Sequence, residues 1–263
     1  MNISVIIPTC NRPDYLRRTV AAWRDYGVQD AEIVIADDGS DRETRKLMAQ
    51  LAPDAAIFSP VRRGLGANLN RACAVARGDY HLILQDDFEL TRNIADDLRI
   101  ALATLAAGKC DIFRLGTPLD ALRFYPPGTP QGYPPGHDPL ARMTVVSGQW
   151  PVASPDPATR TPDPGPRIPD PGSRTPDPAC LVFARAAHKD AWIYSDNPHV
   201  RRADFLKKFG RYDETFAKMA DCETEMRDRC NARGIVAAWR KLRETEPAFD
   251  HIGVISNRMD RGF

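Results

Sequence analysis

The sequence predicts an α/β fold: a mainly parallel sheet flanked by helices, formed as a single domain with a proline-rich insertion. Three observations predict it. Short β-branched strands alternate with helical patterns as far as Leu115, polar clusters follow four consecutive strands, and 16 of the 23 prolines lie between Pro126 and Pro178. The composition of the 263 residues, 43% hydrophobic and 27% charged, is typical of globular proteins.

The first part of the chain alternates strand and helix patterns. We expect strands over Ile3–Ile7, Glu32–Ala36, Ala55–Phe58, Tyr80–Leu84 and Asp111–Leu115, and helices over Pro13–Tyr26, Asp41–Leu51, Leu65–Ala76 and Asn93–Ala107. Strands joined by helices of this length form βαβ units, which make parallel sheets. Ligands of such sheets gather at the carboxyl ends of the strands, so this edge is where a site is expected.

The last part of the chain has fewer regular patterns. They predict a strand over Cys180–Phe183, a helix over Arg201–Phe209, a helix over Cys222–Arg233 and a last strand over Ile235–Trp239. Beyond Phe249 the chain lacks clear periodicity, so we expect a tail that folds back over the rest.

The proline-rich segment contains a seven-residue repeat. Three copies, SPDPATR, TPDPGPR and IPDPGSR, run from Ser154 to Arg174, and a fourth begins at Thr175. Such residues cannot bury a core, so the segment is expected to be disordered or polyproline-II-like. An expanded repeat tolerated in a surface loop explains it better than a docking ligand for a proline-binding domain or a flap over an acceptor.

Charge and cysteine usage narrow the class of protein. A net charge of +1 argues against a general nucleic-acid binder, because neutralising many phosphates needs surplus basic residues. Six cysteines without CxxC spacing suggest neither a zinc ribbon nor a disulfide framework, and favour a reducing, intracellular setting. No stretch approaches the roughly 20 apolar residues of a membrane helix, so we expect no transmembrane segment and only peripheral membrane contact.

Carboxylates are concentrated after two of the expected strands. Asp86, Asp87 and Glu89 follow the fourth strand, where their mutual repulsion favours a bound divalent cation. A helix start explains Glu89 well but the two aspartates poorly. Asp37 and Asp38 could form only a turn, although their position beside the first and fourth strands favours a ligand role.

Three segments of the sequence resemble a known protein family. ISVIIPTCNRPDYLRRTV, EIVIADDGSDRET and RRGLGANLNRACAVARGDYHLILQDDFEL resemble, in this order, the family-2 glycosyltransferases, which have the GT-A fold, a Rossmann-type sheet. The resemblance covers Ile3 to about Leu115. It implies that residues 1–118 bind a nucleotide-diphosphate sugar, and that residues 179–263 bind the acceptor and carry the catalytic base. Residues 126–178 are the insertion between them.

The resemblance also implies roles for single residues. Those placed on the nucleotide sugar are Thr9, Asn11, Arg12, Asp38, Arg63, Gly64, Gly66, Asn70 and Asp86. The family's Asp-x-Asp element, which binds ribose and a diphosphate-bound Mg²⁺ or Mn²⁺, lies over Gln85, Asp86 and Asp87, so its first carboxylate is absent here. Asp87 is then the expected metal ligand, and His251 resembles a late histidine that returns to the diphosphate or metal.

The catalytic base is sought in Arg211–Gly234. This segment resembles the family's helix start that carries the base, and alignment selects Glu223, whereas an offset of two selects Asp221. Apart from the resemblance, acids at a helix start need only complement its dipole. Arg201 or Arg202 is expected to reach a phosphate or a polar acceptor.

Together these residues predict an inverting, metal-dependent glycosyltransferase. Its acceptor would be a glycan, a lipid-linked compound or a small molecule, in cell-surface or exported glycan synthesis, with the enzyme cytoplasmic or peripheral at the inner face of the membrane. One alternative is a degenerate, non-catalytic binding protein, suggested by Gln85. Another is a sugar-nucleotide nucleotidyltransferase, which would need a Gly-rich, Arg-containing loop after the first strand. A receiver-like phosphoacceptor is disfavoured, because no clear later lysine ends a strand.

Overall fold

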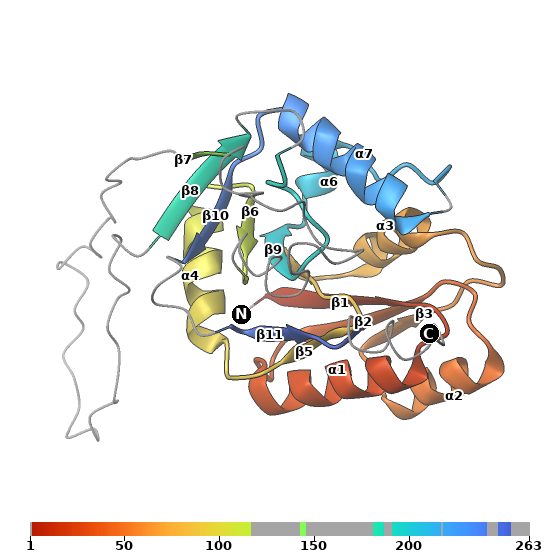
Figure 1. The fold of residues 1–263 in the computed structure, drawn as a ribbon. Coiled ribbons are helices and arrows are strands. Elements are labelled where there is room, and N and C mark those ends of the chain that lie inside the picture. The colour runs from red at the N-terminus through yellow and green to blue at the C-terminus, as the bar shows by residue number, and fades with distance from the viewer. Residues whose placement is uncertain are drawn as a thin grey trace, which may run out of the picture.

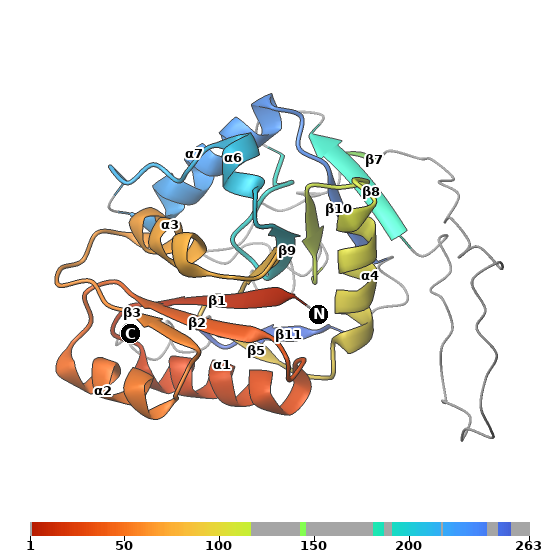
Figure 2. The same ribbon diagram turned by 180° about the vertical axis from the view of Figure 1, so that it is seen from behind.

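A nine-stranded sheet forms the centre of the molecule, and helices cover both of its faces (Figures 1 and 2). This computed structural model describes residues 2–116, 143–145, 181–186, 191–216, 218–240 and 247–253. The strand order is β3-β2-β1-β4-β9-β6-β10-β8-β7. The pairing makes seven strands run in one direction and β8 and β9 in the other. The predicted mainly parallel sheet is therefore confirmed.

The first half contains the predicted elements in the predicted order. They are β1 (Ile3–Thr9), α1 (Pro13–Tyr26), β2 (Glu32–Asp37), α2 (Arg42–Gln50), β3 (Ala55–Ile57), α3 (Leu65–Val75), β4 (Tyr80–Ile83), α4 (Ala95–Ala106) and β6 (Ile112–Arg114). Local signals set several ends: a proline begins α1, and Asp41 caps α2 by accepting the Thr44 N–H at 2.8 Å. Strands β1 to β4 are parallel, so their carboxyl ends meet at one edge.

The second half completes the sheet and differs more from the prediction. Its elements are β7 (Met143–Val145), β8 (Leu181–Ala186), β9 (His199–Arg202), α6 (Phe205–Phe209), α7 (Met219–Ala232) and β10 (Ala237–Arg240). The helix predicted from Arg201 is wrong at its start, because Arg201 and Arg202 end the central strand β9, between β4 and β6. The repeat at Ser154–Pro178 lies outside the described residues.

Alternating side chains of the sheet build two cores. Val5 and Ile7 of β1 pack on the face covered by α1, α2 and α4, whereas Ile6 packs on the face covered by α3, α6 and α7. The second core therefore joins helices from both halves of the chain. Its packing fixes α7 beside α3, which brings the second half to the edge where β1 to β4 end (Figure 1).

A small second sheet was not predicted. It consists of β5 (Phe88–Leu90), directly after the two aspartates, and β11 (Phe249–His251), paired antiparallel with Phe88 opposite His251. The described part of the chain beyond Phe249, as far as Gly253, folds back over β5, and this pairing brings His251 to the end of β4.

Candidate functional site

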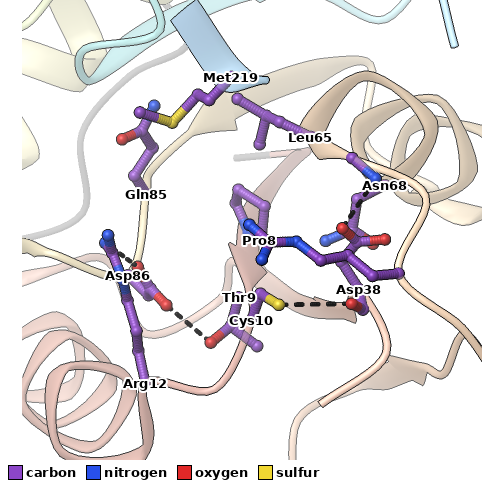
Figure 3. Close-up of a pocket in the computed structure, with 12 residues that line it drawn as sticks. Pro8, Thr9, Cys10, Arg12, Asp38, Leu65, Asn68, Gln85, Asp86 and Met219 are labelled. Carbon is purple, nitrogen blue, oxygen red and sulfur yellow. Dashed lines mark hydrogen bonds and ion pairs between the residues drawn. The ribbon is translucent and has the colours of Figure 1, made fainter. Parts of the chain in front are cut away.

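A pocket opens at the carboxyl ends of β1, β2 and β4, the edge where the sequence predicts a ligand (Figure 3). The start of α3 and the first residue of α7 complete its walls. Its lining comprises Pro8, Thr9, Cys10, Arg12, Asp38, Arg62, Gly64, Leu65, Asn68, Gln85, Asp86 and Met219. Five of the residues predicted to bind the nucleotide sugar, namely Thr9, Arg12, Asp38, Gly64 and Asp86, thus surround one space.

Asp86 is held rigidly in the acidic wall of this pocket. Thr9 Oγ1 donates to Asp86 Oδ2 at 2.7 Å, and Thr19 Oγ1 of α1 donates to the Asp86 carbonyl oxygen at 2.7 Å. The second carboxylate oxygen, Oδ1, lies 3.4 Å from Arg12 Nη1. The side chain is therefore fixed between β1 and α1, and only 4% of Asp86 is exposed.

The side chains of Arg12 and His251 converge on Asp87. Arg12 Nη1 lies 2.8 Å from Asp87 Oδ2, and His251 Nε2 lies 3.3 Å from the same oxygen. The His251 ring is also stacked on Phe88, with 4.5 Å between ring centroids and an interplanar angle of 3°. The structure thus places His251 next to Asp87, as its predicted metal role requires.

The two adjacent carboxyls differ in acidity. Burial, together with the charge of Asp87, raises the pKa of Asp86 to about 7. Burial also opposes ionisation of Asp87, but the contacts with His251 and Arg12 outweigh it and lower the pKa of Asp87. Asp87 is consequently the carboxylate that carries the negative charge at neutral pH.

A divalent metal would find part of its ligand shell here. The buried Oδ1 of Asp87 has no hydrogen-bond partner among the described residues, and a buried bare carboxylate oxygen is costly unless a cation or donor reaches it. The described part of the chain contains no group of three or more His, Cys, Asp or Glu side chains arranged as a complete metal site. Asp87 and His251 therefore fit a metal that takes its remaining ligands from a bound diphosphate and water.

Asp38 organises the loop that closes the pocket on the side of β3. Its two carboxylate oxygens accept the backbone N–H groups of Arg63, at 2.8 Å, and Gly64, at 2.9 Å. Gly39 beside it has φ +76°, and a Cβ there would lie 2.5 Å from the Arg62 nitrogen. The turn after β2 therefore requires glycine so that the Arg62–Gly64 loop can approach.

Two other predicted residues also contact these loops. Asn11, in the left-handed region at φ 52°, accepts the Asp41 N–H through Oδ1 at 2.8 Å. Arg63 Nη2 lies 2.9 Å from Glu214 of the second half, and half of the Arg63 side chain is exposed. Neither side chain belongs to the pocket lining given above, so any contact they make with a donor would be at its rim.

Gly66 and Asn70 are not among the residues that line the pocket. Asn70 Nδ2 donates to the Tyr212 carbonyl at 2.9 Å, and Asn70 Oδ1 accepts the Tyr212 N–H at 3.1 Å. A Cβ on Gly66 would lie 2.8 Å from Cys222 Sγ, so this glycine lets α7 approach α3. The structure places both residues where α3 meets the second half, whereas Asn68, on a different side of α3, lines the pocket.

Helix α7 brings the predicted base toward the pocket. Met219 lines the pocket, and Glu223 lies one turn later on the same side of the helix. Glu223 Oε1 accepts the Asp196 N–H at 2.9 Å, and burial raises the pKa of Glu223. Asp221 is exposed in the first turn of α7.

The arginines predicted on the acceptor side are differently placed. Arg201 is fully buried, and its Nη1 donates to the Tyr212 hydroxyl at 2.9 Å, so it does not reach out to an acceptor. Arg202 is exposed and lies 3.2 Å from Asp204. The cause is the strand β9, whose alternation points Arg201 inward.

Sequence reasoning missed Asn68, Arg62, Cys10 and Met219 in the pocket lining. Asn68 had a usable signal, since it lies four residues after Gly64 and so on the side of α3 that faces the glycine-containing loop. No signal in the sequence indicated Met219, because it precedes the recognisable acids of α7.

Comparison with known proteins supports this arrangement. Residues 4–113, which supply every strand end of the pocket, match the model of the family described as glycosyl transferase family 2. This match covers 110 of the 263 residues, so it shows a likeness of the first part of the chain to that family. Two curated proteins match over part of their length. A GalNAc(5)-diNAcBac-PP-undecaprenol beta-1,3-glucosyltransferase of Campylobacter jejuni is 29% identical over 93 residues, and an uncharacterized glycosyltransferase of Nostoc is 38% identical over 92 residues.

Those matches cover 34% and 33% of this chain, and 30% and 28% of the relatives' own lengths.

Solved structures extend the likeness of fold to the second half. S. aureus TarS 1–349 in complex with UDP has a TM-score of 0.57 at 14% identity, over 95% of this chain and 60% of that one. The mannosyltransferase PcManGT from Pyrobaculum calidifontis, in complex with GDP-Man and Mn²⁺, has a TM-score of 0.54 at 15% identity, over 90% and 53%. The chain therefore has the GT-A fold. None of the helices that the structure describes is long and apolar enough to cross a membrane.

Proposed function

We propose that this protein transfers a sugar from a nucleotide-diphosphate sugar to an acceptor hydroxyl, with inversion at the anomeric carbon and with a divalent metal. One observation carries the proposal: a single pocket joins the strand ends that hold Thr9, Asp38 and Asp86 to the helix that holds Glu223. Residues from the two halves of the chain thus meet at one edge of the sheet, which supports a donor side and an acceptor side there.

The donor would lie along the carboxyl ends of β1, β2 and β4. Asp38 and the Arg62–Gly64 loop that it orients would contact the nucleoside, and Asp86 the sugar nucleotide. Arg12 would lie beside the diphosphate, whose negative charge its guanidinium complements. The solved structures named above that contain UDP or GDP-Man support a nucleotide-bound donor.

Asp87 and His251 would hold Mg²⁺ or Mn²⁺. When bound, such an ion neutralises charge on the leaving diphosphate. Asp87 is suited to this role because its contacts keep it ionised, and because its Oδ1 lacks a partner among the described residues. The Mn²⁺ in the PcManGT structure supports a divalent ion in this fold.

Glu223 would act as the general base. The acceptor O–H breaks, its proton passes to the Glu223 carboxylate, the acceptor oxygen bonds to the anomeric carbon, and the bond from that carbon to the diphosphate oxygen breaks with its electron pair. A single displacement of this kind inverts the anomeric centre. The raised pKa of Glu223 suits the role, since a base is most effective when its pKa approaches the working pH.

We further propose a lipid-linked acceptor, used in cell-surface glycan synthesis at the inner face of the membrane. The support is the Campylobacter relative, whose name includes PP-undecaprenol.

The test is a panel of UDP-, GDP- and dTDP-sugars with Mn²⁺, read as nucleotide release, with the wild type and Glu223→Gln. We expect one donor class to be consumed, and Glu223→Gln to keep donor affinity while its turnover falls by about 10²–10⁴-fold. Glu225→Gln is the matched control, since Glu225 lies on the same helix but pairs with Arg229. Donor binding without release would favour a non-catalytic binding protein, and full turnover by Glu223→Gln would remove Glu223 from the role of base.

A further inference from the structure

A second carboxyl, which neither the sequence reading nor the proposed mechanism uses, lies next to Glu223. Asp196 belongs to the segment before β9, 27 residues earlier in the chain, and its backbone N–H donates to Glu223 Oε1 at 2.9 Å. Ser195, its neighbour, also hydrogen-bonds the Glu223 side chain. The segment before β9 thus holds the glutamate of α7 in position.

The Asp196 side chain is more deeply buried than that of Glu223. Only 1% of Asp196 is exposed, and its Oδ1 accepts the Tyr194 hydroxyl at 2.5 Å. Its Oδ2 is buried and has no hydrogen-bond partner in the described chain. A carboxylate oxygen in that position is costly if charged but is tolerated if it carries a proton.

Three arginines lie near the pair: the charges of Arg114 and Arg227 favour the ionised form of Glu223, and that of Arg201 favours the ionised form of Asp196. Tyr194 also meets the Tyr212 hydroxyl at 2.6 Å, and Arg201 of β9 donates to Tyr212 at 2.9 Å, so two hydroxyls separate this cation from Asp196. The other groups that face the pair are Arg114 of β6 and Arg227 and Cys222 of α7. Arg114 Nη1 donates to the Trp192 carbonyl at 3.0 Å, and Arg227 lies 2.6 Å from Asp228.

Electrostatics agrees with the geometry. Burial, and then the charge of Glu223, raise the pKa of Asp196 to about 7. Two interacting carboxyls of this kind titrate as a unit, and one of them keeps its proton at a pH where isolated carboxyls are ionised.

We propose that Asp196 is a positioning residue for Glu223, and that the two side chains form a carboxyl pair holding one proton, which resides on Asp196. The inference rests on the proposed role of Glu223 as base. Its consequence is that Glu223 stays ionised and ready to accept the acceptor proton, while its neighbour is neutral. Loss of the Asp196 proton would place two negative charges side by side and hold the next proton on Glu223 more tightly.

The first test needs no turnover. Infrared titration of the free protein is expected to show two carboxyls that lose their protons near pH 7, Asp86 of the pocket and Asp196. Asp196→Asn, which keeps an oxygen for the Tyr194 hydroxyl, should remove one of these transitions, and Glu223→Gln should move the same one to lower pH. Asp204→Asn changes an exposed carboxylate of the same half and should leave both transitions in place. A titration between pH 6 and 8 that is the same in the wild type and in Asp196→Asn would overturn the proposal.

The second test uses the donor identified above. Asp196 is neutral below pH 7 in the wild type, so Asp196→Asn should leave the acid limb of the pH profile of kcat/KM in place and should remove the change in kcat/KM near pH 7 that ionisation of Asp196 gives the wild type. A residue that only supported the fold would lower activity at every pH and keep the change near pH 7, and that result would also overturn the proposal. If no donor is consumed, the proposed function fails, and the infrared titration still decides whether the pair shares a proton.

Discussion

At the scale of single residues, the charge of the site depends on two adjacent aspartates and on one arginine. Asp86 and Asp87 are both nearly buried, and Arg12 is the side chain that contacts both. Neighbouring buried carboxylates repel, so an unneutralised pair would favour unfolding. Arg12 therefore has two effects: it stabilises the acids in the absence of a metal, and it competes with a metal for Asp87 Oδ2.

These two effects of Arg12 predict that Arg12→Ala changes the stability of the free protein and the stabilisation by metal in opposite directions. Without metal the variant should lose about 1–3 kcal/mol of unfolding free energy, because the nearly buried Asp87 loses the guanidinium that lies 2.8 Å from its Oδ2. With Mn²⁺ its melting temperature should rise more than that of the wild type. Thermal unfolding with and without Mn²⁺ measures both.

Arg18→Ala is the matched control for this prediction, because Arg18 lies on the same helix and pairs with the more exposed Glu89. Exposed pairs contribute little, so its stability should change by less than about 1 kcal/mol. If Arg12→Ala were as stable as Arg18→Ala and gained no more from Mn²⁺, the competition between arginine and metal would be disproved.

At the scale of elements, function depends on how α3 and α7 meet. The base lies on α7 and the donor loop precedes α3, so the position of one helix against the other sets the distance between the two halves of the reaction. Gly66 lets the helices approach, and Asn70 bonds both backbone polar groups of Tyr212. These residues therefore align the site without lining the pocket.

Asn70→Ala should consequently weaken the fold more than donor binding. It leaves the buried N–H and C=O of Tyr212 without their asparagine partner, which should lower the unfolding free energy by about 1–3 kcal/mol. Donor affinity, measured by calorimetry, should change less than about threefold. Asn2→Ala removes an exposed asparagine bond to Asp79 and should be neutral. A large loss of donor affinity at unchanged stability would instead restore the nucleotide contact that the family resemblance implies.

The elements also show where sequence reasoning works. Helices such as α1 and α2 were predictable because their apolar spacing and their starts agree, as with the proline at the start of α1 and the Asp41 cap. The helix predicted from Arg201 failed because an arginine is expected at the surface, whereas in β9 Arg201 is buried and donates to Tyr212 and to Cys73 of α3. The β5–β11 pair was not predictable, since three-residue strands gain their stability from each other and from α1.

The candidate site was likewise predictable only where its residues follow a recognisable local pattern. Thr9, Arg12, Asp38 and Asp86 follow directly from the ends of predicted strands, and the pocket contains them all. Asp196 could not be found in this way, because only the tertiary fold places the segment before β9 against α7. Residues that act through a neighbour far away in the chain leave no local pattern.

At the scale of the whole molecule, the proline-rich repeat lies between two strands that pair with each other. Strand β7 runs antiparallel to β8, with Met143 opposite Ala186 and Val145 opposite Ala184. The chain therefore leaves the sheet at β7 and returns to it at the neighbouring strand, whatever the length of the connection. Antiparallel neighbours can be joined by very short loops.

We therefore predict that deleting Ser154–Pro178 leaves the fold and the donor site intact. The deletion shortens the connection between Val145 and Leu181 from 35 residues to about ten, which is ample for a hairpin and favours the folded state by about 1 kcal/mol through loop closure. Urea unfolding and donor affinity should match or slightly exceed those of the wild type. A longer deletion, Met143–Pro178, is the control: it also removes β7 and bares the edge of β8, so it should be less stable and more prone to aggregate. If the shorter deletion already abolished folding, the repeat would be part of the structure, and the division of the chain into two working halves joined by a dispensable insertion would be wrong.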